Sequence, residues 1–179
     1  LNLALSLADS GKKVLFIDAD LRKAVLMGRT EVEGEEIKGL SHLLSHQETI
    51  ENVICATNVP RFHIIYAGIV PPNPAELLGG KYFKRFLSAI RKVYDYVIID
   101  TPPLGSVIDS AVIADECDGS IIVMESGVIS YRFAQDVKGQ LEKCNCPILG
   151  VILNKVDMSK QGYYGKYYGK YGDKKTEKK

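Results

Sequence analysis

The stretch Val14-Leu-Phe-Ile-Asp18-Ala-Asp20-Leu-Arg22 joins a short apolar run to two carboxylates and a cation. A run with so few interior polar residues is typical of a parallel strand that is buried on both faces. Alternate residues of an extended chain point the same way, so Asp18 and Asp20 are expected to reach into one cleft.

Four further apolar runs of this kind follow, at Phe62–Ala67, Tyr96–Ile99, Ile121–Met124 and Ile148–Leu153. Helical patterns lie between the runs. Residues 2–9 look like the back half of a helix that ends at Gly11. The alternation predicts an α/β fold, with a doubly wound, mainly parallel sheet, helices on both faces and right-handed crossovers.

Two more helices are predicted from their N-terminal signals. Asn73-Pro74-Ala75-Glu76 combines an N-cap residue, a proline at the first helical position and a glutamate at the third. The helix that it opens carries an apolar stripe of Tyr82, Phe83, Phe86, Leu87 and Ile90. Ser130 is the expected cap of a helix whose stripe is Phe133, Val137 and Leu141.

Acidic residues stand at the ends of these predicted strands. Asp18 and Asp20 follow the first strand, and Asp100 ends the run Tyr96-Val-Ile-Ile-Asp100 before a Thr-Pro-Pro turn. Ligands of such sheets bind beyond the carboxyl ends of the strands. A lone aspartate after a strand is often only a turn residue, but two such motifs together fit the hard oxygen ligands that Mg²⁺ prefers.

The C-terminal segment differs from the rest in composition. Residues 159–179 are rich in glycine and carry seven lysines against Asp173 and Glu177, which gives a net charge of +5. No apolar period of 2 or 3.6 runs through this segment. We therefore expect a folded domain over 1–158 and a flexible tail over 159–179, whose exposed tyrosines are Tyr163, Tyr164, Tyr167, Tyr168 and Tyr171.

Composition narrows the classes of function. The chain has 179 residues, of which 46% are apolar and 25% charged, as in an ordinary soluble domain. No apolar run approaches the ~20 residues that span a bilayer, and no signal peptide is recognisable, so a cytosolic body is expected. The body shows no basic face for a nucleic-acid partner.

Two residue pairs raise the question of a metal site. Cys144 and Cys146 have no second pair at zinc-like spacing, so a metal site there is the less favoured interpretation. His42 and His46 lie four apart on a predicted helix but have no carboxylate in register, and a solvated helix face is expected.

The strand-end motifs resemble those of a known superfamily. Asp18-x-Asp20-x-Arg22 is similar to the Walker A′ motif of the deviant-Walker P-loop ATPases, and the run into Asp100-Thr-Pro-Pro is similar to Walker B. Within that group, Ile17-Asp-Ala-Asp-Leu-Arg-Lys23, Pro72-Asn-Pro-Ala-Glu-Leu-Leu78 and the tyrosine cluster resemble the bacterial tyrosine kinases of capsule and exopolysaccharide synthesis.

The resemblance implies ATP and Mg²⁺ as cofactors and roles for particular residues. Asp20 and Asp100 would hold the metal, and Asp18 would accept the proton of an incoming tyrosine hydroxyl. Spacing alone leaves open which of Asp18 and Asp20 is the base. Arg22 would stabilise phosphate charge or bridge to a neighbouring subunit, or else form a salt bridge that holds the Asp18–Asp20 turn. Asn154 would contact adenine, or else form a turn.

The implied function is ATP-dependent autophosphorylation of the tail in trans, which regulates capsule or exopolysaccharide synthesis and export. The implied partners are a transmembrane activator, other copies of the chain in a ring-like homo-oligomer, and a tyrosine phosphatase, with no nucleic acid. The implied location is cytoplasmic, at the inner face of the cell membrane, through the membrane partner.

One departure from the family pattern opens two alternatives. The family's Gly-Lys-Ser/Thr phosphate loop does not occur in these 179 residues, and its place would lie just before Asn2-Leu3-Ala4. Without the strand that feeds this loop, two strand edges and a hydrophobic slot should be exposed. The alternatives are a catalytically inactive phospho-acceptor module, for which this chain alone would be inactive, and a partition- or positioning-type ATPase.

Overall fold

The computed structural model describes residues 1–23, 26, 37–103, 109–144 and 146–156. Its larger sheet has four strands in the order β2 (Cys55–Ala56), β3 (Phe62–Ile65), β1 (Val14–Asp18) and β4 (Tyr96–Asp100). β1 pairs in parallel with both β3 and β4, while the short β2, which sequence reasoning did not predict, is antiparallel to β3. The predicted α/β fold with a mainly parallel sheet is confirmed.

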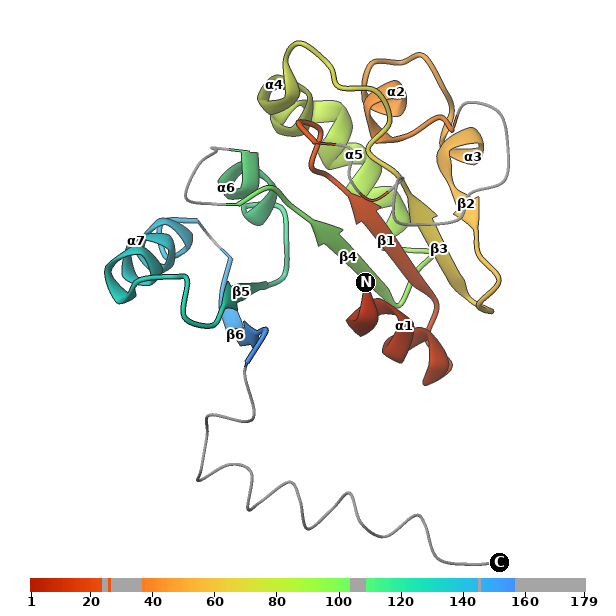
Figure 1. Cartoon of the computed structure of the whole chain (residues 1–179). Helices are drawn as coiled ribbons and strands as arrows, with labels where there is room; N and C mark the ends of the chain where they lie inside the picture. Colours follow the sequence, from red (N-terminus) through yellow and green to blue (C-terminus); the bar gives the residue numbers. More distant parts are fainter. Residues whose placement is uncertain (24–25, 27–36, 104–108, 145, 157–179) are drawn as a thin grey trace, which may run out of the picture.

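The last two predicted strands form a separate pair. β5 (Ser120–Glu125) and β6 (Ile148–Asn154) are parallel, and their register brings Glu125 opposite Asn154. Within the described part of the chain, β4 pairs only with β1, and β5 pairs only with β6. The expected open strand edges are therefore present at β4 and β5 (Figure 1).

Helices cover both faces of the larger sheet. The alternating residues of β1 divide between two apolar clusters, Phe16 in one and Leu15 and Ile17 in the other. The Phe16 cluster includes Ala4 and Ala8 of α1 (Asn2–Asp9). The second cluster takes its helical residues from α2 (Leu40–Leu44), α3 (Ile50–Val53), α4 (Pro74–Gly79), α5 (Lys81–Ile90) and α6 (Asp109–Ala114).

A third cluster belongs to the smaller sheet. Val137 and Leu141 of α7 (Tyr131–Leu141) pack with Ala114, Cys146 and neighbouring apolar side chains. The expected cap of this helix is confirmed, because the Phe133 backbone N–H donates to the Ser130 hydroxyl at 3.2 Å. The predicted end of α1 is also confirmed, because the helix stops at Asp9 and Gly11 adopts a left-handed φ of +87°.

The single helix predicted to start at Asn73 is two helices. Gly80 has an extended backbone (φ −71°, ψ 153°), so α4 ends at Gly79 and α5 starts at Lys81. The predicted apolar stripe lies on the second helix, which buries Phe83, Phe86, Leu87 and Ile90. Asn73 forms no side-chain cap bond, and its amide donates instead to the Glu76 carboxylate at 2.7 Å.

The expected solvated face of His42 and His46 is wrong. His42 is buried, and its Nδ1 accepts the Gly39 N–H at 3.1 Å. His46 lies beyond the end of α2, with φ +58°, and its ring contacts Tyr82 with centroids 4.2 Å apart. The two histidines therefore share no helix face. Over the described ranges, no helix is long and apolar enough to cross a membrane.

The packing of α5 leads to a stability prediction. Phe83 is fully buried in the large cluster, so the Phe83→Ala change should lower the free energy of unfolding by about 3–5 kcal/mol through lost burial and a cavity. Tyr82→Ala is the matched control, because that neighbouring aromatic side chain is 36% exposed and should cost far less. Urea unfolding of both variants measures the difference, and equal losses would contradict the assigned packing.

Candidate functional site

Asp18 and Asp100 lie next to each other at the carboxyl edge of the larger sheet. β1 and β4 lie side by side (Figure 1), and their parallel register ends with Asp18 opposite Asp100. The Ala19 N–H then donates to the Asp100 carbonyl at 2.8 Å, which extends the pairing by one residue. The two motifs, 82 residues apart in sequence, thus meet at one point of the sheet.

Asp18 is the more buried of the carboxylates in the first motif, with 3% of the residue exposed. Burial raises the pKa of Asp18 to about 6, and the nearby Asp100 and Asp20 carboxylates push the pKa in the same direction. The Asp20 N–H, which donates to Asp18 Oδ1 at 3.2 Å, only partly offsets this rise. Asp18 is therefore an acceptor whose proton affinity lies near the neutral range.

Asp100 shares this environment. Burial also raises the pKa of Asp100, and the charge of Asp20 adds to the effect. Each of Asp18 and Asp100 is thus disfavoured as a carboxylate partly by the presence of other carboxylates. A cation placed among them would relieve that repulsion.

Asp20 lies in the turn that follows β1 and is only partly buried. Its Oδ1 accepts the backbone N–H groups of Arg22 at 3.2 Å and Lys23 at 3.1 Å. These bonds hold the turn in place. Both of them use Oδ1 of Asp20, so neither amide engages Oδ2. Asp20 thus has an oxygen oriented by a rigid turn beside the Asp18–Asp100 pair.

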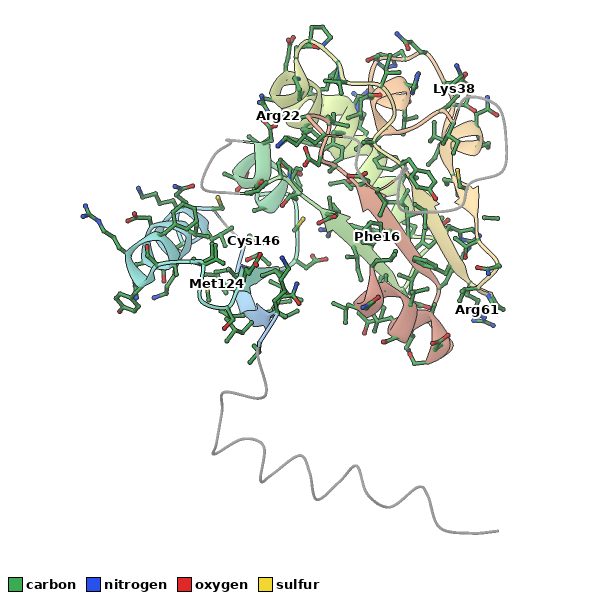
Figure 2. The ribbon with its side chains drawn as sticks, in the orientation of Figure 1. Phe16, Arg22, Lys38, Arg61, Met124 and Cys146 are labelled. Carbon is green, nitrogen blue, oxygen red and sulfur yellow. The ribbon has the colours of Figure 1, made fainter. Side chains whose placement is uncertain are left out.

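The side chain of Arg22 reaches a residue that the sequence did not single out. Its Nε donates to Asp109 Oδ2 at 2.7 Å, and its Nη2 donates to Asp109 Oδ1 at 3.2 Å. Figure 2 shows Arg22 in the turn after β1, beside α6. Of the two alternatives for Arg22, a salt bridge is present, but its partner is Asp109 at the start of α6 rather than the Asp18–Asp20 turn.

Asn154 ends β6 on the smaller sheet. Its Oδ1 accepts the Lys155 N–H at 2.9 Å, and its carbonyl accepts the Ser126 N–H at 2.9 Å. Lys155 has a φ of +54°, and its Nζ pairs with Glu125 at 2.9 Å. The geometry of a turn-forming Asn154 is present, while its contact with adenine stays a prediction.

The donor set suits a cation that is shared with a ligand. Among the described residues, no three His, Cys, Asp or Glu side chains gather closely enough to hold a metal ion by themselves. Mg²⁺ is commonly held by only one or two carboxylates together with waters and substrate phosphates. Asp20 and Asp100 fit that partial donor set.

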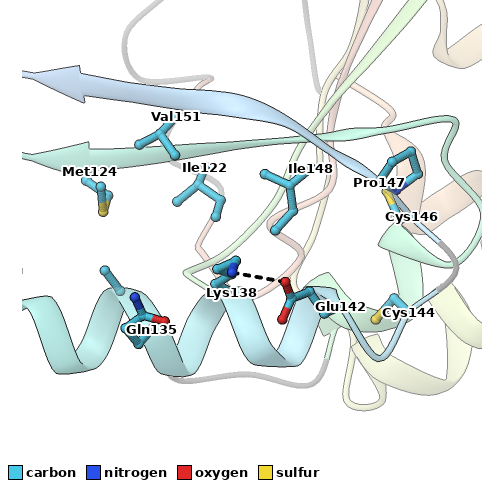
Figure 3. A pocket seen from close by; sticks show the side chains of 11 residues that line it. Ile122, Met124, Gln135, Lys138, Glu142, Cys144, Cys146, Pro147, Ile148 and Val151 are labelled. Carbon is cyan, nitrogen blue, oxygen red and sulfur yellow. Dashed lines mark ion pairs between the residues drawn. The ribbon is translucent and has the colours of Figure 1, made fainter.

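A pocket of about 670 Å³ lies elsewhere, between α7 and the smaller sheet (Figure 3). Its walls include Ile122, Met124 and Val151, and the ion pair of Lys138 with Glu142 (3.1 Å) lies on its helical side. Neither Asp18 nor Asp100 lines it. We place the candidate site at the acidic strand ends, because this pocket contains none of the strand-end aspartates.

The remaining predictions concern the C-terminal tail and two cysteines. The tail tyrosines Tyr163, Tyr164, Tyr167, Tyr168 and Tyr171 lie outside the described residues, as does the boundary predicted at residue 158. Cys144 and Cys146 pack with the third apolar cluster, with Cys146 buried there.

The chain resembles proteins of known family. The model of the AAA domain family matches residues 1–144. The tyrosine-protein kinase CpsD of Streptococcus agalactiae is 46% identical over 168 residues, which cover 93% of this chain and 73% of that protein.

Solved structures agree with this relationship. The kinase domain of the Escherichia coli tyrosine kinase ETK superposes with a TM-score of 0.81 at 35% identity, over 90% of this chain and 63% of that one. The septum site-determining protein MinD of Pyrococcus horikoshii, solved with Mg-ADP, has a TM-score of 0.67 at 24% identity, over 85% of this chain and 61% of that one, a likeness of fold alone. The chain therefore belongs to the bacterial tyrosine kinases of the P-loop NTPase superfamily.

Proposed function

We propose that this protein is an ATP-dependent tyrosine autokinase that phosphorylates its own C-terminal tyrosine cluster in trans. The observation that carries the proposal is the buried Asp18, which is paired in register with Asp100 and has a pKa of about 6. Its relatives named as tyrosine-protein kinases support the reaction class.

Asp20 and Asp100 are the proposed holders of Mg²⁺ at the end of the sheet. When bound, Mg²⁺-ATP supplies the phosphoryl group, and the cation neutralises charge that develops during transfer. The two carboxylates orient the metal from the protein side, and the turn that binds Asp20 Oδ1 keeps that residue in place. The match to the AAA domain family and the relatives named as tyrosine-protein kinases support this choice of cofactor.

Asp18 is the proposed general base, rather than Asp20. A general base works best when its pKa lies near the working pH, because it must be both unprotonated and able to accept a proton. Burial gives Asp18 that property, whereas Asp20 is partly exposed and engaged by two backbone amides. Asp18 would accept the tyrosine hydroxyl proton as the tyrosine oxygen forms a bond to the γ-phosphorus of ATP. The bond between that phosphorus and the β–γ bridging oxygen would break, and ADP would leave.

Arg22 and Asn154 are proposed to contact the nucleotide. Asp109 occupies Nε and one Nη2 hydrogen of Arg22, so three of the five N–H donors remain for phosphate oxygens or for a neighbouring subunit. The Arg22 side chain is 45% exposed, which leaves these donors accessible. Asn154 is proposed to lie beside adenine.

The proposed acceptor is the tail of another copy. The 21 residues from Ser159 span at most roughly 70 Å when extended, at ~3.3 Å per residue, which suffices to reach a neighbouring site. Five phosphates would change the net charge of the tail from +5 to about −2.5 to −5. Such a reversal would weaken the attraction of the tail for an acidic site and so loosen a ring of subunits.

This cycle of assembly is proposed to regulate capsule or exopolysaccharide synthesis and export. The proposed setting is the inner face of the cell membrane, where a transmembrane activator recruits the kinase and a tyrosine phosphatase reverses the mark. No nucleic acid takes part.

A catalytically inactive phospho-acceptor module is the second candidate. The observation that favours it is the tyrosine cluster of the tail, since these hydroxyls could accept phosphate from any tyrosine kinase. A chain of this kind would gain phosphate only from another kinase. A positioning ATPase is less favoured, because the TM-score with ETK (0.81) exceeds that with MinD (0.67).

The Asp18→Asn variant should lose activity and gain stability. The pKa of Asp18 in the folded protein lies above its ordinary value of 3.8. The charged Asp18 therefore destabilises the fold by an amount that grows as the pH rises from about 4 to 6 and stays constant at higher pH. Removing the charge should therefore raise the free energy of unfolding at pH 7.5 by about 1–2 kcal/mol, with little change at pH 4.

Urea unfolding of the metal-free, full-length protein measures this effect, and phosphotyrosine assays measure the activity. Asp136→Asn is the control, because that carboxylate is exposed on α7 and should change neither quantity. Full autophosphorylation by Asp18→Asn would rule out Asp18 as the base.

Mixing two variants tests transfer in trans. The first is full-length Asp18→Asn with an intact tail, and the second carries Phe at all five tail tyrosines but keeps Asp18. Neither should become phosphorylated alone, whereas the mixture with Mg²⁺-ATP should label the Asp18→Asn protein.

Two results would contradict this account. An unlabelled mixture, when the wild type labels itself, would exclude transfer in trans. A wild type that is labelled only by an added kinase would instead favour the phospho-acceptor module.

Light scattering tests the proposed ring of subunits. ATP should dissociate the wild-type oligomer but not the oligomer of the five-Phe variant, and equal behaviour of the two proteins would contradict this part of the proposal.

A further inference from the structure

Helix α6 begins with two buried polar residues, Asp109 and Ser110. Each of them bonds to a different turn of the candidate site. Asp109 contacts the turn after β1, and Ser110 contacts the turn after β4. The two turns are therefore joined to one helix as well as to each other.

The Asp109 contact is a two-bond fork. The Asp109 side chain is 1% exposed, and Arg22 donates to both of its oxygens, at 2.7 and 3.2 Å. A buried carboxylate needs such a partner, and a planar two-bond pair fixes the orientation of the guanidinium as well as its position. The backbone N–H of the same Arg22 binds Asp20 Oδ1, so a force on its side chain is passed to the Asp20 turn.

The Ser110 contact holds the second turn. Its buried hydroxyl donates to the carbonyl of Pro102, two residues after Asp100. The turn that contains Pro102 has two consecutive prolines and is stiff, so fixing one carbonyl restrains the direction in which the chain leaves Asp100. Neither contact reaches the proposed reacting atoms.

The geometry points to Asp109 and Ser110 as positioning residues that hold the Asp20 turn and the Asp100 turn in the arrangement that binds Mg²⁺-nucleotide. This inference rests on the proposed function, since the metal-holding roles of Asp20 and Asp100 come from it. Asp109 acts through Arg22, whose backbone N–H binds Asp20 Oδ1. Ser110 acts through the backbone of the Asp100 turn.

The test compares Arg22→Gln, Asp109→Asn and their double variant in the full-length protein. Electron paramagnetic resonance measures Mn²⁺ binding independently of catalysis, both with ADP and with Mn²⁺ alone. The measurement with Mn²⁺ alone excludes the phosphate contact proposed for Arg22. Each single change should weaken Mn²⁺ binding by ~10–100-fold, the range for residues that support metal ligands. The double variant should bind Mn²⁺ with about the same affinity as the single variant that binds it less tightly, because both changes break the same Arg22–Asp109 contact.

The signs of the effects separate positioning from simple electrostatics. Arg22→Gln removes a positive charge, and Asp109→Asn removes a negative one, so electrostatics alone would strengthen Mn²⁺ binding in the first and weaken it in the second. Positioning weakens it in both. Opposite signs, or Mn²⁺ affinities within twofold of the wild type, would overturn the inference.

Two further variants complete the design. Asp118→Asn is the matched control, because it removes an exposed carboxylate that pairs with Arg91 at 3.0 Å, and it should leave Mn²⁺ binding unchanged. Ser110→Ala should weaken Mn²⁺ binding and add to the Arg22→Gln effect, since it acts through a different turn.

If Asp109→Asn fails to fold, Arg22→Gln and Ser110→Ala decide the matter, with unchanged binding in both as the contrary result. A wild type that binds neither Mn²⁺ nor ADP would instead contradict the proposed function itself.

Discussion

The structure depends on one unfavourable arrangement: parallel pairing of β1 with β4 brings Asp18 against Asp100, with Asp20 one turn away. Burial raises the pKa of both paired carboxylates, and repulsion from neighbouring carboxylates (Asp100 and Asp20 for Asp18, Asp20 for Asp100) adds to the rise. Such an arrangement costs folding free energy when no cation is bound, and active sites are where proteins retain costs of this kind. A divalent cation with a polyphosphate ligand would relieve the repulsion among the carboxylates, and this relief would favour binding of the cation.

The remainder of the fold keeps this edge in place. β1 is buried over its whole length, and its alternating side chains divide between the clusters under α1 and under α2 to α5. The carboxylates thus stand at the end of the most restrained strand of the larger sheet. Beyond the end of that strand, where the backbone pairing stops, α6 holds the two turns through its hydrogen bonds to Arg22 and to the Pro102 carbonyl.

Local sequence signals predicted much of this arrangement. The apolar runs before Asp18 and Asp100 were predicted correctly as parallel strands with acidic ends. That the two strands are neighbours in the sheet was known only from the structure. Asp109 was missed because its contact with Arg22 spans 87 residues and nothing in its own surroundings marks it. The extended Gly80 and the buried His42 were missed for a similar reason. Both depend on tertiary packing, which overrides the pattern of a continuous helix or an exposed face.

The central claim is that burial and neighbouring carboxylates raise the pKa of Asp18, and that a bound cation lowers it. A carbon-13 NMR titration of the Asp18 carboxyl group, with and without Mg²⁺-ADP, tests this claim most directly. We predict a pKa of about 6 for the metal-free protein. Mg²⁺-ADP should lower this pKa, because a cation favours the charged form, but should leave it above the ordinary 3.8, because the burial that raises it persists. A pKa near the ordinary value of 3.8 in the metal-free protein, unchanged by Mg²⁺-ADP, would contradict the account.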